Sequence, residues 1–185
     1  MQYMVEMKIP RSRVAVLIGP KGEIKKRIEE ATSTTLRVDS GEGDVQLSSE
    51  DSVGLYTAKV LVQAIGRGFS PERAMLLLNP EYVLDILLLR DYIGTKKGMI
   101  RIKGRVIGQE GKSRAVIEEL TEAHLSVYGK TIGIIGLPEN VALARHAVES
   151  LLKGSPHSGV FRWLERQHRQ LRMRNLFNVA DGGAR

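Results

Sequence analysis

Cysteine is absent from this sequence of 185 residues, and aromatic residues make up only 5% of it. The lack of cysteine excludes disulfide bonds, cysteine-ligated zinc, iron–sulfur clusters and a cysteine nucleophile. The histidines are scattered without the paired spacing of a metal site, at His124, His146, His157 and His168. The sequence therefore favours a protein that uses no metal and no other cofactor.

Long apolar runs are absent as well. The longest, residues 83–89, is interrupted by Asp85 and is too short to span a bilayer. The first residues have neither the basic start nor the apolar run of a signal peptide. We therefore expect a cytoplasmic protein with no membrane partner. At 42% hydrophobic residues, the chain has enough apolar side chains for one domain or two small ones.

Positive charge exceeds negative charge, and the excess lies in the second half of the chain. Lysine and arginine total 28 against 21 acidic residues, which gives a net charge of +7. Residues 1–92 hold 12 basic and 13 acidic residues, whereas residues 93–185 hold 16 and 8. Within each half a basic cluster stands out, over residues 8–27 and 96–114. Clustered positive charge is typical of proteins that bind a polyanion and favours nucleic acid.

An internal repeat relates the two basic clusters. Residues 18–22, Ile-Gly-Pro-Lys-Gly, align with residues 107–111, Ile-Gly-Gln-Glu-Gly, at an offset of 89. The register continues without a gap through Ile28 over Ile117 and beyond. Both glycines and the apolar positions around them recur. The pattern predicts two copies of one small α+β unit.

Each copy is predicted to run strand, helix, G-x-x-G turn, helix, strand, strand, helix. In the first copy the strands are expected near 3–9, 36–38 and 45–47, with a closing helix through Ile65 that Asp51 or Ser52 caps. In the second copy a strand is expected over 99–103 and a short helix over 105–107. Its later elements are expected over 112–120, 125–128, 131–135 and 139–152.

The G-x-x-G turn is the candidate binding element of each copy. Glycine at both ends lets the backbone approach a ligand closely, and the next helix directs free N–H groups and a positive dipole end outward. With cations nearby, this turn is suited to hold a sugar-phosphate backbone beside an apolar groove for the bases. The candidate RNA-binding residues are Gly19, Pro20, Lys21, Gly22 and Lys25 in the first copy, and Arg101, Lys103, Arg105, Gly108, Gln109, Glu110, Gly111, Lys112 and Arg114 in the second.

Both loops resemble the KH domain, whose G-x-x-G loop clamps about four nucleotides of single-stranded RNA. The order of elements is similar to that of a type I KH domain, βααββα. Further segments resemble one family with two KH domains, the small-subunit ribosome-assembly factors of pre-rRNA processing. These segments are residues 101–108, 117–121, 127–131, 154–158 and 161–165. The short length and the two intact loops resemble archaeal members.

This resemblance implies an α+β fold of two tandem type I KH domains, each a three-stranded antiparallel sheet backed by helices. It implies a non-catalytic protein that binds single-stranded RNA and holds the 3′ end of small-subunit rRNA during maturation. The implied protein partners are the endonuclease that matures this rRNA and the alpha subunit of initiation factor two.

The domains are expected over residues 1–68 and 95–153, joined by a helical connector over 69–94. Apolar runs in the connector indicate packing between the domains or, alternatively, an exposed docking surface for a protein partner. A basic helix is expected over 154–177, followed by a disordered tail over 178–185.

Two other readings stay open at this point: a protein-interaction scaffold, and a general KH protein acting in translation or RNA decay. A nuclease is least favoured, because the sequence has no carboxylate cluster typical of a two-metal site. Glu110 places an acid in the second loop, where Lys21 stands in the first. We still expect the second groove to bind RNA more tightly, because more cations surround it.

Overall fold

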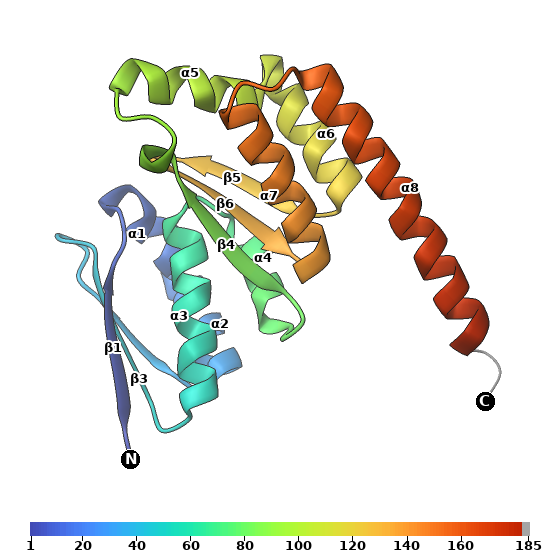
Figure 1. The fold of residues 1–185 in the computed structure, drawn as a ribbon. Coiled ribbons are helices and arrows are strands. Elements are labelled where there is room, and N and C mark those ends of the chain that lie inside the picture. Colours follow the sequence, from blue (N-terminus) through green and yellow to red (C-terminus); the bar gives the residue numbers. More distant parts are fainter. Residues whose placement is uncertain (183–185) are drawn as a thin grey trace. The chain divides into compact units, whose positions relative to one another are not determined.

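Residues 1–182, which the computed structural model describes, form two three-stranded sheets and a set of helices (Figure 1). They divide into two compact units. The first comprises Met1–Leu88 and His124–Leu137, and the second comprises Leu89–Ala123 and Pro138–Arg185. No helix among the described residues is long and apolar enough to cross a membrane.

The first copy of the repeat lies entirely within the first unit. Its strands are β1 (Tyr3–Lys8), β2 (Thr35–Val38) and β3 (Asp44–Ser49), and they pair antiparallel in the order β1-β3-β2. Its helices are α1 (Arg11–Ile18), α2 (Glu23–Thr32) and α3 (Ser52–Gly66). The chain order is therefore βααββα, as the sequence predicted. Of the two expected caps of α3, Asp51 is the one that accepts a hydrogen bond, from the Val53 N–H at 2.9 Å.

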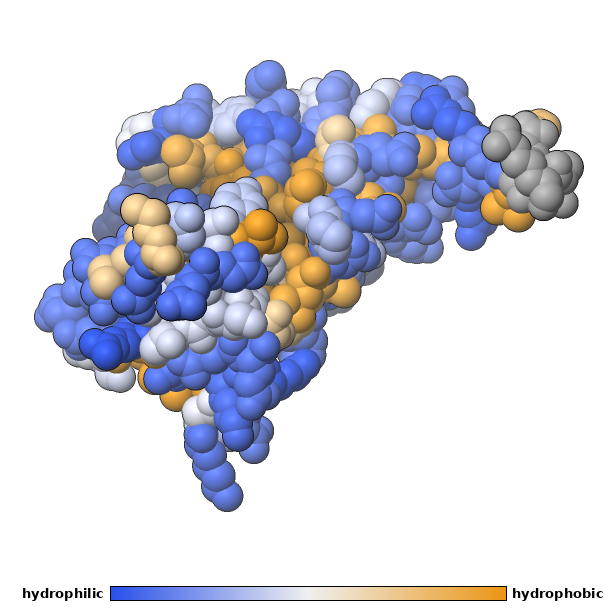
Figure 2. Space-filling view, turned by 90° about the horizontal axis from the view of Figure 1, so that it is seen from below, coloured by the Kyte–Doolittle hydropathy of each residue, from blue (hydrophilic) through white to orange (hydrophobic). Residues whose placement is uncertain are grey.

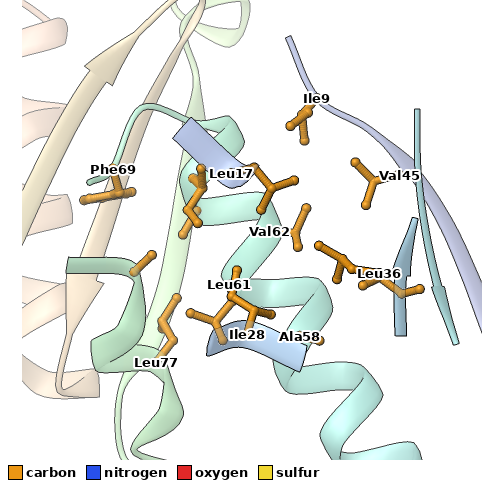
Figure 3. Close-up of a cluster of buried hydrophobic side chains, with 14 of the residues drawn as sticks. Ile9, Leu17, Ile28, Leu36, Val45, Ala58, Leu61, Val62, Phe69 and Leu77 are labelled. Carbon is orange, nitrogen blue, oxygen red and sulfur yellow. The ribbon is translucent and has the colours of Figure 1, made fainter. Parts of the chain in front are cut away.

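The core of this copy lies between the sheet and the helices (Figure 3). Leu36 and Leu47 face inward from neighbouring strands and are fully buried, as is Ile28 of α2. Leu61 of α3 completes the contact from the helical side. Each fully buried aliphatic side chain of this kind contributes about 1.5–3 kcal/mol. This packing holds the turn between α1 and α2 in place.

The second sheet also belongs to the first unit. It contains β4 (Val83–Leu88), β5 (His124–Tyr128) and β6 (Thr131–Gly136), antiparallel in the order β4-β6-β5. This strand order repeats that of the first sheet. Every residue of the central strand β6 is buried. The two sheets thus have the same topology, which confirms the predicted fold class.

The connector packs against both sets of elements in the first unit. Ser70 caps the short helix α4 (Pro71–Ala74), and the 3₁₀ turn η2 (Met75–Leu78) contacts α3 and β6. Phe69 is 1% exposed and lies so close to β6 that a Cβ on Gly133 would stand 2.7 Å from its ring. The connector therefore joins α3 to the second sheet by apolar contact.

A polar contact that the sequence did not indicate reinforces this junction. Arg13 donates to the carbonyl oxygens of Ile65 and Phe69, at 2.8 and 2.7 Å, and its guanidinium lies 5.6 Å from the ring centre of Tyr128. Partial burial lowers the pKa of Arg13 from its ordinary value. Arg13 therefore links the start of α1 to the end of β5.

The second unit is made of helices α5 (Lys96–Ile107), α6 (Lys112–Thr121), α7 (Pro138–Leu152) and α8 (His157–Gly182), together with the 3₁₀ turn η3 (Leu89–Asp91). α8 packs on α6 and α7 through the buried side chains of Val160 and Leu164. The helix expected over 154–177 extends to Gly182, so residues 178–182 of the expected disordered tail are helical. Residues 183–185 lie outside the described part of the chain.

The first strand of the second copy was predicted in the wrong place. Residues 99–103 belong to helix α5, whereas the strand is β4, inside the segment expected to be a helical connector. The second copy therefore begins before residue 95. α5 is capped by Thr95, which accepts from the Gly98 N–H at 3.1 Å, and it buries Gly98, Ile102 and Val106 along one face. Within residues 99–103, apolar and basic side chains alternate as they would in a strand, because Arg101 and Lys103 stand on either side of Ile102.

Candidate nucleic-acid interface

The first G-x-x-G turn has a backbone that departs from the helices on both sides. Gly19 ends α1 with φ of 72°. Lys21 and Gly22, in the 3₁₀ turn η1 (Pro20–Gly22), both adopt left-handed conformations, with φ of 53° and 75°. A left-handed conformation costs a residue with a side chain about 1–2 kcal/mol. Such local strain is common at binding sites.

The second turn repeats this geometry to within a few degrees. Gly108, Glu110 and Gly111 have φ of 72°, 54° and 75°, within the region of the 3₁₀ turn η4 (Gln109–Gly111). Glutamate thus takes the strained position that lysine takes in the first turn. The two loops differ in side chains and agree in backbone, so the backbone is the feature that the repeat retains.

The two glycines of each turn are needed for different reasons. A Cβ on Gly19 would stand 2.4 Å from Ile24 Cγ1, and one on Gly108 would stand 2.6 Å from Ser113 Cβ. The first glycine therefore allows close packing against the next helix. A Cβ on Gly22 or Gly111 would meet nothing within 4 Å. The second glycine faces open space, where a phosphate has room to approach.

The helices that follow these turns begin without side-chain caps. Asp51, Ser70 and Thr95 cap α3, α4 and α5, whereas no side chain caps α2 or α6. The first N–H groups of α2 and α6, those of Glu23 and Lys112, donate to the carbonyl oxygens of Pro20 and Gln109, and the N–H groups that follow have no capping side chain. Free N–H groups at a helix N-terminus bind anions, and the helix dipole adds to the attraction. This geometry favours an anion at each turn, and binding there stays a prediction.

Cations near the first turn are partly neutralised by their neighbours. Nζ of Lys8 lies 3.6 Å from Oδ1 of Asp44, and Nη2 of Arg11 lies 3.0 Å from Oε1 of Glu42. Lys26 pairs with Glu30 at 3.9 Å. Of the predicted residues, Lys21 is exposed and Lys25 is half-buried one turn into α2. The first turn therefore relies chiefly on these two lysines.

Cations near the second turn are less paired. Lys112 is exposed and Arg114 is half-buried in the first turn of α6, and neither forms an ion pair within the part of the chain that the structure describes. The first turn of α6 also carries no acid, whereas that of α2 carries Glu23. Glu110 is the opposing charge. Tighter phosphate binding at the second turn stays a prediction.

The three predicted RNA-binding residues of α5 do not form one patch. In a strand Arg101, Lys103 and Arg105 would share a face, but in a helix Lys103 lies about 200° around the axis from Arg101. Arg105 donates to the carbonyl oxygen of Leu151 at 3.0 Å and to that of Ser155, which ties α5 to the end of α7. The guanidinium of Arg105 is therefore engaged within the protein, unlike that of Arg101, which is exposed.

Replacing Arg105 tests this structural role. Arg105→Gln should lower the free energy of unfolding by about 2 kcal/mol, because buried carbonyl groups lose a charged donor. The Kd for RNA should change by less than about twofold, which corresponds to about 0.4 kcal/mol of binding free energy. Denaturant unfolding and an RNA titration on the same variant measure both. A large loss of affinity with unchanged stability would instead place Arg105 at the RNA.

Two residues that the sequence did not indicate as part of the turns pack against the first glycine of each. They are Ile24, which packs against Gly19, and Ser113, which packs against Gly108. Their common offset of 89 was visible in the sequence. Ile24 and Ile18 are half-buried and pack against the core beside the first turn. They supply apolar surface next to the turn, where the bases of a bound strand are expected.

The repeated βααββα order, the shared strand order and the paired G-x-x-G turns define a tandem type I KH protein. A KH domain family model matches residues 4–64, and a second model, described as "Eukaryotic type KH-domain (KH-domain type I)", matches residues 83–169. The start of the second match coincides with β4.

Comparison with similar proteins shows to which family of KH proteins this chain belongs. A KH domain-containing protein of Methanocaldococcus jannaschii is 44% identical over 170 residues, which cover 90% of this chain and 74% of that protein. The pre-rRNA-processing protein pno1 of Schizosaccharomyces pombe is 27% identical, over 85% of this chain and 68% of its own length. The aDim2p chain of an a/eIF2alpha–aDim2p–rRNA crystal structure from Pyrococcus horikoshii is 46% identical with a TM-score of 0.86, and the match covers 91% of this chain and 96% of that one. This chain belongs to the Pno1/Dim2 family of RNA-binding, pre-rRNA-processing KH proteins.

Proposed function

We propose that this protein holds the 3′ region of small-subunit rRNA as a single strand during ribosome maturation. The observation that carries the proposal is the pair of uncapped G-x-x-G turns with the same backbone geometry, each followed by a helix N-terminus. A phosphate at each turn would accept hydrogen bonds from the backbone and meet Lys21 or Lys112. The relative that was crystallised with rRNA supports the choice of RNA.

Two protein partners belong to this proposal. The endonuclease that matures the rRNA end would act on the strand that this protein presents. The alpha subunit of initiation factor two is supported by the complex of the Pyrococcus horikoshii relative, which contains a/eIF2alpha. The presence of an initiation factor in that complex also favours a second role, in translation. In this role the same RNA-binding surface would bind the rRNA of mature small subunits.

The cellular target can be identified by ultraviolet cross-linking in the cells that make this protein. Cross-linked fragments should concentrate at the 3′ end of small-subunit rRNA and its immature extension. They should be depleted when Lys21 and Lys112 are both replaced by glutamate. Cross-links spread evenly over messenger RNA, with no enrichment at this rRNA end, would contradict the proposal and favour a general KH protein.

We also propose that the protein itself is not an enzyme. The purified protein should neither cleave RNA nor hydrolyse nucleotides with Mg²⁺ or Mn²⁺ present. Glu110 is the one acid among the proposed site residues, and the described residues contain no group of three or more His, Cys, Asp or Glu residues that could hold a metal ion. Incubation with end-labelled RNA and with ATP, each resolved by electrophoresis or chromatography, measures this. Metal-dependent cleavage that disappears in a folded Glu118→Gln variant would show that a catalytic carboxylate had been overlooked.

A further inference from the structure

A hollow in the first unit lies apart from the G-x-x-G turn. Its volume is about 580 Å³, and residues of α3, the connector and β4 line it. Val53, Tyr56 and Val60 of α3 line one side, and Val83, Leu84 and Ile86 of β4 line the other. No residue of the lining is charged. A polyanion needs cations at its binding site, so this lining does not suit RNA.

One wall of the hollow is an apolar stripe on α3. Val53, Tyr56 and Val60 follow one another at the three- and four-residue spacing that places side chains on one helix face. Val53 is 72% exposed and Tyr56 is 68% exposed. The opposite face of α3 fills the core of the first copy. α3 is therefore apolar on two sides, and the second side is open. Hydrophilic side chains cover most of the face of the molecule seen in Figure 2, with apolar ones between them.

The other wall is the edge of a sheet. In the order β4-β6-β5, β4 pairs only with β6 among the described strands, so its second edge has no strand partner. Five of its six residues are aliphatic, and Asp85 is the exception. The corresponding edge strand β1 carries Glu6 and Lys8, the kind of charges that protect an edge from pairing. The edge of β4 is therefore less protected than that of β1, and Val83, Leu84 and Ile86 of β4 line the apolar hollow.

We infer that this groove binds an extended segment of a partner protein, which adds to the sheet as a strand beside β4. Backbone N–H and C=O groups of the segment would pair with the open edge of β4, and apolar side chains at alternate positions would pack against Val53, Tyr56 and Val60. β4 has six residues, so the paired part of the segment spans about 20 Å. This mode identifies the partner by its chemistry: a peptide with aliphatic or aromatic residues at every second position.

A random dodecapeptide library displayed on phage provides the probe, with the full-length protein as bait. Enriched peptides should alternate apolar and polar residues. One of them, synthesised and labelled, should bind the protein in solution and slow the exchange of backbone amides in Val83–Leu88. Tyr56→Glu should weaken this binding at least tenfold. Because Tyr56 is mostly exposed, the variant should fold and keep its RNA affinity, which serves as the check on its integrity.

Met173→Glu is the matched control, since Met173 is also an exposed apolar residue, 58% exposed, and lies on α8. It should bind the peptide within twofold of the original protein. Failure to enrich any peptide, or equal binding by Tyr56→Glu, would overturn the inference. Two further outcomes would also overturn it: a dimer that Tyr56→Glu dissociates, which would assign the edge to a second copy, and displacement of the peptide by single-stranded RNA. The proposed RNA function is tested separately, by variants of the G-x-x-G turns, so a failure of the peptide experiment would leave it unaffected.

Discussion

Gly111→Asp should weaken the binding of single-stranded RNA by about thirtyfold, which corresponds to about 2 kcal/mol. A Cβ at this position meets no atom within 4 Å, and aspartate tolerates a left-handed backbone better than most residues. The protein should therefore fold, and the new carboxylate would stand where a phosphate approaches. Two like charges about 4 Å apart repel by about 1–4 kcal/mol at a protein surface. A fluorescence anisotropy titration at fixed salt measures the change.

The same substitution at Gly22 should cost less, about threefold or 0.7 kcal/mol. Lys8, Arg11 and Lys26 near this turn are held by neighbouring acids, whereas Lys112 and Arg114 near the second turn form no ion pair among the described residues. Gly22→Asn and Gly111→Asn are the matched controls, because asparagine adds the same shape without the charge. Both variants should bind single-stranded RNA with a Kd within about twofold of that of the original protein, a difference of about 0.4 kcal/mol. A greater loss from Gly22→Asp would show that the first turn dominates, and equal losses would show that the turns hold one strand jointly.

The largest effect on stability is expected at the first glycine of a turn. Gly19→Ala should lower the free energy of unfolding by about 3 kcal/mol, because the new methyl group overlaps Ile24 and the residue must keep a positive φ. For a chain of this size the melting temperature should fall by roughly 6–12 °C. Thermal unfolding followed by circular dichroism measures the shift.

Gly22→Ala is the control for this prediction. It has the same positive φ and no steric overlap, so it should cost only about 1 kcal/mol. The difference between the two variants isolates the packing of Gly19 against α2. Equal destabilisation would mean that backbone conformation alone requires glycine at both positions and that the close approach to Ile24 relaxes without cost.

The binding turns were predictable from the sequence because everything that forms them is local. Both glycines and the apolar positions around them recur at one offset. The φ angles of the two turns agree to within a few degrees. The uncapped helix ends could also have been foreseen, since no Ser, Thr, Asp or Asn stands at Gly22 or Gly111. Local sequence was sufficient for the backbone of the two turns.

Other features depend on residues distant in the chain. The segment from Met99 to Lys103 alternates like a strand, yet Gly98, Ile102 and Val106 have equally good helical spacing, so periodicity could not decide. The cap at Thr95 was the signal that would have favoured the helix. The role of Arg105 could not be foreseen, because the Leu151 and Ser155 carbonyl groups lie 46 and 50 residues away.

The most direct test of RNA binding by the turns is a comparison of three nucleic acids of one sequence, that of the 3′ end of small-subunit rRNA. Single-stranded RNA, the RNA duplex and single-stranded DNA are titrated with the purified protein and with the Gly22→Asp/Gly111→Asp double variant. We expect the RNA single strand to bind at least about tenfold, or 1.4 kcal/mol, more tightly than the duplex, and this preference to be lost in the double variant. Equal affinity for the duplex, or a double variant that binds single-stranded RNA as well as the original protein, would contradict the account.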